Sequence, residues 1–124
     1  MAAITNDKFL EIFGAEPDGR QLLSIGEVFE VGEVKVFLVN HAVMVGHTAE
    51  AFAQLREQVS EAGTVTDLDG IGIEAFLSPS TVEGTVEGVV HTERAIVGVS
   101  VTGKPTGKHD AEGAVKELMK VVSA

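Results

Sequence analysis

Two segments of the chain show the same pattern of hydrophobic and polar positions. In each, a strand of alternating apolar residues leads through a polar, glycine-containing loop into a helix with an apolar stripe. The strand at 34–39 precedes a helix predicted over 48–62, and the strand at 95–101 precedes a helix predicted over 110–122. We interpret this order as a duplicated strand-loop-helix unit, which indicates a sheet with helices packed on it.

The remaining pattern adds an N-terminal helix and several strands. A helix is predicted over 6–13, with Gly14 as its stop and with Phe9, Leu10 and Phe13 on one face. Residues 21–24 are compatible with one more helical turn. Strands are predicted at 27–31, 34–40, 64–66, 73–77 and 81–91, with Gly32-Glu33 as the turn of a hairpin. The order predicts one α+β domain over residues 1–124, with two or three helices on a twisted, mainly antiparallel sheet of about five strands.

The strand predicted at 81–91 has glycine and valine alternating on one face. That face contains Val82, Gly84, Val86, Gly88 and Val90. The opposite face contains Glu83, Thr85, Glu87, Val89 and His91. Because glycine has no side chain, we expect a helix to pack very close to the first face, and we expect the second face to be exposed.

Composition excludes several classes of function. The 124 residues contain no Cys, so disulfides and thiolate metal sites are excluded. The formal net charge is −10, and no cluster of basic and aromatic residues occurs, which argues against nucleic acid as a partner. No apolar run approaches the roughly 20 residues that span a bilayer, so we expect no membrane insertion.

The N-terminal residues 1–8 lack the basic and apolar regions of a signal peptide. We therefore expect a cytoplasmic protein if Met1 is the native start. An extracellular or cell-envelope location is expected instead if the sequence is a cloned mature domain.

No catalytic, metal or cofactor motif is complete in this chain. The basic loop, residues 103–110, lies between a strand and a helix as a phosphate-binding loop would, but three residues rather than four separate Gly103 from Gly107. His109 also stands where such a loop needs Ser or Thr. The four histidines lack the spacing of metal ligands, although His41 and His47 share one loop. We predict no catalytic residue, no metal and no cofactor, and an enzyme is the less favoured class.

The C-terminal part of the chain resembles a known family. Gly70-Ile71-Gly72-Ile73-Glu74-Ala75-Phe76 is followed by a hairpin, a Val-rich strand and a closing helix. This order, over residues 34–124, resembles small actinobacterial lipoprotein-type domains of unknown function, whose turn reads Gly-Leu-Gly-Asp-Glu-Ala-aromatic. Glu74 and Phe76 match that turn, Ile73 replaces its Asp, and the paired cysteines and lipobox of secreted members are absent. The resemblance implies a Mog1/PsbP-like α/β/α fold without catalytic residues.

The interpretation that we favour is a non-enzymatic binding or protein-interaction module, with a protein or a small ligand as its partner. Its candidate binding residues are Glu83, Glu87 and His91 on the acidic strand face, and Lys104, Lys108 and His109 in the basic loop.

Two alternatives stay open. One is a small-ligand carrier or small enzyme with a pocket between the sheet and the helix at 48–62, which a cavity containing His41, His47 or His91 would favour. The other is a self-assembling structural subunit that forms a homo-oligomer, which Val-rich edge strands low in Lys would favour.

Overall fold

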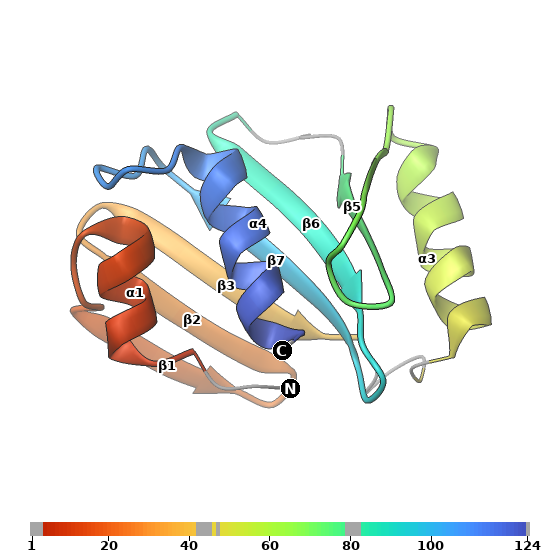
Figure 1. Ribbon diagram of the computed structural model, residues 1–124, viewed down its shortest axis with the longest axis horizontal. Helices are drawn as coiled ribbons and strands as arrows, with labels where there is room; N and C mark the ends of the chain where they lie inside the picture. The colour runs from red at the N-terminus through yellow and green to blue at the C-terminus, as the bar shows by residue number, and fades with distance from the viewer. Residues whose placement is uncertain (1–3, 42–45, 47, 79–82, 124) are drawn as a thin grey trace.

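The computed structural model describes residues 4–41, 46, 48–78 and 83–123. Within these residues the fold is α+β, with three helices and one seven-stranded sheet (Figure 1). In chain order the elements are α1 (Asn6–Phe13), β1 (Gly19–Leu23), β2 (Gly26–Val31), β3 (Val34–Asn40), α3 (Ala49–Ser60), β4 (Thr66–Leu68), β5 (Glu74–Ser78), β6 (Thr85–His91), β7 (Ile96–Thr102) and α4 (Ala111–Val122).

The sheet consists of two antiparallel meanders joined at its centre. Its strand order is β1-β2-β3-β7-β6-β5-β4, and every neighbouring pair is antiparallel. Each pair joins consecutive strands except β3 and β7, which pair Val36 with Val101 and Leu38 with Val99. This one long-range pairing unites the two halves of the chain in a single sheet.

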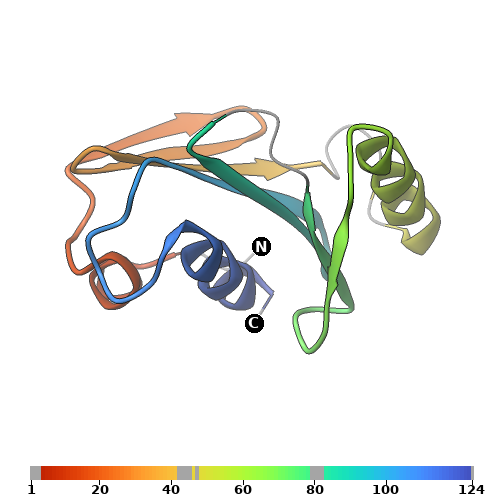
Figure 2. The same cartoon turned by 90° about the horizontal axis from the view of Figure 1, so that it is seen from above.

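Helices α1 and α4 cover one face of the sheet (Figure 2). Helix α4 begins at its N-cap Asp110, whose carboxylate accepts a hydrogen bond of 2.8 Å from Gly113 N. The buried residues of α4 include the predicted stripe Val115, Leu118, Met119 and Val122. Helix α1 has the predicted bounds, although Ile12 is buried in place of Leu10, which is 49% exposed.

The predicted glycine–valine face of β6 is confirmed at its centre. Val86 and Val90 pack in the core beneath α4, and a Cβ on Gly88 would lie 2.9 Å from Met119 Sδ and 3.1 Å from Val115 Cγ1. The same explanation is wrong for Gly84, where a Cβ would meet nothing within 4 Å and where φ is +79°. Gly84 serves the turn before β6, and Val82 lies outside the described residues.

Helix α3 lies on the opposite face of the sheet, beside β5 (Figure 2). It begins at the predicted N-cap Thr48, and Phe52 is its buried residue, at 3% exposed. The Phe52 ring lies 5.3 Å from that of Phe76 and stacks on His91 at 5.5 Å. A bidentate pair, Arg56 to Asp67 at 2.9 and 3.0 Å, ties α3 to β4.

One expectation needs correction. Residues 21–24 do not form a helical turn, because most of this segment belongs to β1, which pairs with β2. The sheet has seven strands, which is roughly consistent with the predicted number of about five. Both strand-loop-helix units occur, but their helices lie on opposite faces of the sheet, so duplication stays an interpretation of the sequence.

No helix in the described part of the chain is long and apolar enough to cross a membrane.

Gly88→Val should lower the free energy of unfolding by about 1–3 kcal/mol, because the added side chain meets α4. Gly84→Ala should cost about 1–2 kcal/mol for a different reason, its left-handed backbone. A double-mutant cycle in urea separates the two causes. Met119→Ala should offset part of the cost of Gly88→Ala and none of the cost of Gly84→Ala. Additive effects at Gly88 and Met119 would contradict the close packing of α4.

Phe52→Ala should detach α3 while the rest of the fold persists, because Phe52 is the one residue that α3 buries fully. The change should cost about 3–5 kcal/mol in the stability of α3 docking. Hydrogen exchange should show lost protection of the α3 amides and retained protection in β3 and β7. Leu10→Ala is the control, expected within about 0.5 kcal/mol because that side chain is half exposed. Equal loss of protection in β7 would contradict local detachment.

Candidate functional site

A cavity lies between α3 and the sheet face that α1 and α4 leave uncovered. Its volume is about 250 Å³, and it is partly open to solvent. Strands β3, β5, β6 and β7 and helix α3 all contribute to it. The apolar side chains around it include Phe37, Val39, Leu55, Val59 and Val89, and the polar ones are His41, Ser78, Glu87 and Ser100.

The hollow results from small residues at the centre of the sheet. Strand β7 is rich in valine, but Gly98 and Ser100 are the residues that it turns toward the cavity. Larger side chains surround them, with Phe37 and Val39 on β3 and Leu55 on α3. Because α3 packs at the β5 end through Phe52 and Phe76, its second half stands over this depression without filling it.

The strand register orders the cavity into two rows. Ser78, Glu87 and Ser100 are successive partners across β5, β6 and β7, and they form a polar row. Val89, Gly98 and Val39 are successive partners across β6, β7 and β3, and they form an apolar row beside it. Side chains of partner residues lie about 5 Å apart on one face of a sheet. The cavity is therefore amphipathic, with a polar side and an apolar floor.

His41 lies over Gly98 at the edge of the apolar row. Its backbone N–H donates to Ile96 O at 2.8 Å, which continues the pairing of β3 with β7 by one residue. A Cβ on Gly98 would lie only 2.8 Å from His41 Nε2, so the glycine makes room for the imidazole ring. Burial lowers the pKa of His41 below its ordinary value of 6.5. The ring is therefore neutral at pH 7, with one nitrogen able to accept a hydrogen bond and one able to donate.

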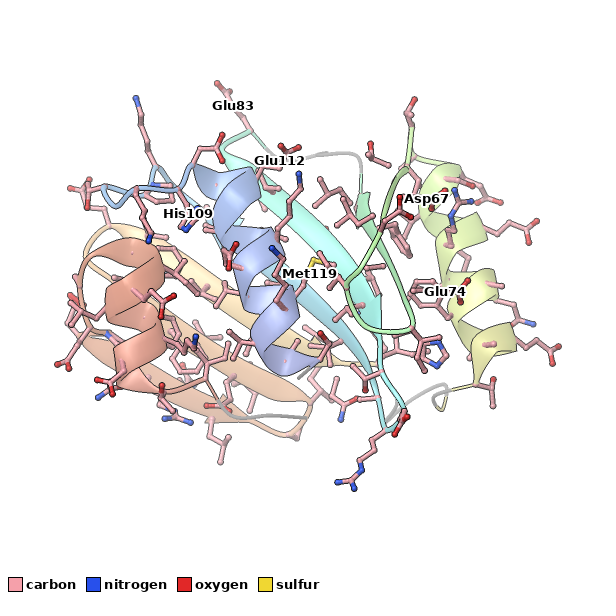
Figure 3. The ribbon with its side chains drawn as sticks, in the orientation of Figure 1. Asp67, Glu74, Glu83, His109, Glu112 and Met119 are labelled. Atoms are coloured by element: carbon pink, nitrogen blue, oxygen red, sulfur yellow. The ribbon has the colours of Figure 1, made fainter. Side chains whose placement is uncertain are left out.

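The three residues predicted on an acidic strand face do not form one exposed surface. Glu87 is exposed at the cavity, whereas Glu83 lies in the turn before β6, at the end of the strand (Figure 3). His91 is 5% exposed, because α3 covers it and Phe52 stacks on its ring. Its Nδ1 lies 3.9 Å from a carboxylate oxygen of Glu74. The expected exposure of this whole face was wrong, since the sequence does not indicate which face α3 covers.

The predicted basic loop lies away from the cavity, between β7 and α4, where Figure 3 labels His109. Lys104 and Lys108 are exposed and His109 is half-buried. A Cβ on Gly107 would lie 2.7 Å from the backbone of Phe13, so this loop packs on the end of α1. The structure does not bring Lys104, Lys108 and His109 together with Glu87.

Sequence reasoning identified His41 as a cavity marker but did not assign Val39, Gly98 or Ser100 to a site. A signal was available, because Gly98 and Ser100 are small residues in a valine-rich strand. His47 lies outside the described residues. Within the described ranges, no group of three or more His, Asp and Glu residues is placed to hold a metal ion.

Comparisons with models of protein families, with curated protein sequences and with solved structures found no match to this chain. The resemblance to lipoprotein-type domains therefore stays a prediction.

The His41 pKa gives this domain a pH dependence of defined sign. Burial disfavours the charged ring in the folded state, so below pH 6.5 the unfolded chain binds a proton that the folded chain resists. Wild type should therefore lose stability as the pH falls below about 6.5. His41→Asn should lose less between pH 7.5 and pH 5.5, as measured by urea unfolding at each pH. Equal acid sensitivity in both proteins would show that His41 is not buried as described.

Proposed function

We propose that this chain is a binding protein for a small, largely apolar ligand, which it takes up in the cavity between α3 and the sheet. The observation that supports this proposal is the cavity of about 250 Å³ with His41 at its edge. This is the feature that favours the pocket interpretation of the sequence over a docking surface.

The size of the cavity limits the ligand. An apolar cavity of about 150 Å³ admits benzene, and pockets for drug-sized molecules begin near 300 Å³. The volume here lies between these values. It suits a compact body of about 8–14 non-hydrogen atoms, such as a bicyclic aromatic or a branched alkyl group.

The lining supports both affinity and orientation. Phe37, Val39 and Leu55 offer apolar surface that a ligand would remove from water, worth about 25 cal/mol per Å² before the costs of association. The neutral ring of His41 and the hydroxyls of Ser78 and Ser100 would fix the polar end of the ligand. A few placed polar groups in an apolar cleft are typical of small-molecule sites.

The other interpretations have less support. The acidic docking face is divided, since α3 covers His91. Self-assembly was expected to use Val-rich edge strands low in Lys. The edge strands β1 and β4 contain no Lys, but they also contain no Val, and they carry the charged residues Arg20 and Asp67. Protein partners and homo-oligomers remain predictions without a specific structural feature in their favour.

Two matched substitutions on the same sheet face test the proposal. Val39→Phe fills the cavity, whereas Val28→Phe adds the same volume on β2, outside the cavity lining. The probe is 1-naphthylmethanol, titrated while the amide resonances of the labelled protein are followed by NMR. A ligand of this size should bind wild type with a dissociation constant between about 10 μM and 1 mM.

Shifts should map to Val39, Gly98, Ser100 and Leu55. Val39→Phe should weaken binding at least about tenfold, a loss of about 1.4 kcal/mol, and Val28→Phe should leave it unchanged. Shifts that map elsewhere, or equal binding to both variants, would refute the cavity as the binding site.

A further inference from the structure

We infer that the ligand of this cavity carries a protonated amine, which Glu87 and the hydroxyls beside it hold at the mouth while the apolar body fills the space under α3. This inference rests on the proposed function and names the chemical class of ligand.

The charges around the cavity favour a cation over an anion. Among the described lining residues, Glu87 is the one acidic side chain, and neither Lys nor Arg occurs. Arg56 follows Leu55 on α3, but its guanidinium is held by Asp67 on β4. Lys35 lies on the same sheet face, opposite Thr102 and beyond Phe37, outside the lining. A carboxylate ligand would therefore find repulsion from Glu87 and no cationic partner in the lining.

The polar row offers oxygen atoms that suit an ammonium group. A primary ammonium has three N–H donors and no acceptor. Glu87 stands between Ser78 and Ser100 in the strand register, so a carboxylate has a hydroxyl on each side. One charge-assisted hydrogen bond to the carboxylate and two to the hydroxyl oxygens would satisfy all three donors.

The apolar row lies beside the polar row, on the side of the cavity where His41 is. An amine bound at Glu87 would place its organic body against Val89 and Val39. The His41 ring covers Gly98 between them, so the body would also lie against that ring. His41 at the far edge is neutral at pH 7, because burial lowers its pKa, and so adds no positive charge that would repel the cation.

Three ligands with the same aromatic body separate this inference from the proposed function. They are 1-naphthylmethylamine, 1-naphthylmethanol and 1-naphthoate, titrated against the full chain at pH 7.4 in 50 and 500 mM salt. The amine should bind about 3- to 10-fold more tightly than the alcohol at low salt, because an exposed carboxylate contributes modestly. The naphthoate should bind more weakly than the alcohol. The advantage of the amine should shrink at high salt.

Glu87→Gln should abolish the tighter binding of the amine relative to the alcohol. The affinity for the alcohol should stay unchanged, which would show that the cavity is intact. Glu83→Gln is the matched control, since it removes one exposed carboxylate from the same segment but lies outside the lining. It should keep the full advantage of the amine.

The outcomes are distinct. Equal affinity of wild type for the amine and the alcohol would overturn the amine inference and leave the proposed function in place. An amine advantage that survives Glu87→Gln, or that Glu83→Gln also abolishes, would overturn the role of Glu87. Failure of all three ligands to shift the cavity resonances at millimolar concentration would refute the proposed function itself.

Discussion

The packing of α4 against β6 and β7 is the contact on which the rest of this structure depends. Met119 and Val115 approach β6 so closely that a side chain at position 88 would have to displace them. With α1 beside it, α4 fills one face of the sheet with the main apolar core. Helix α3 packs on the opposite face. The asymmetry between the two faces, one closed and one partly open, follows from this contact.

The cavity lies where α3 covers only part of its face of the seven-stranded sheet. Helix α3 is held at the β4–β5 end of the sheet. Phe52 packs against Phe76 and His91, and Arg56 pairs with Asp67. The partly buried α3 residues Leu55 and Val59 pack against the same cluster and also line the cavity, where β7 presents Gly98 and Ser100. An element held by one small cluster opens at lower cost than the central strands do. Such local opening would allow a ligand to enter and leave.

The net charge of the whole chain and the charge at the cavity have the same sign. A formal net charge of −10 produces a field that attracts cations over distances near the Debye length. Glu87 stands at the cavity mouth, where a carboxylate acts on a bound ligand at short range. The half-buried ring of His41 has a lowered pKa and stays neutral at pH 7. Long-range attraction and local recognition would thus favour the same ligand charge.

The sequence by itself determined the features that depend on neighbouring residues. Helix α1, the caps Thr48 and Asp110 and the turn at Gly32 were predictable, because caps, turns and amphipathic period are set within a few positions. Strand β1 was not, since it lacks an alternating pattern and is a strand because β2 offers it an edge. Only the tertiary structure decided which face α3 covers, that His91 is buried and that Glu87 and His41 line one cavity. Those outcomes depend on the pairing of β3 with β7 and on which face has apolar surface left to bury, and residues far apart in the sequence determine both.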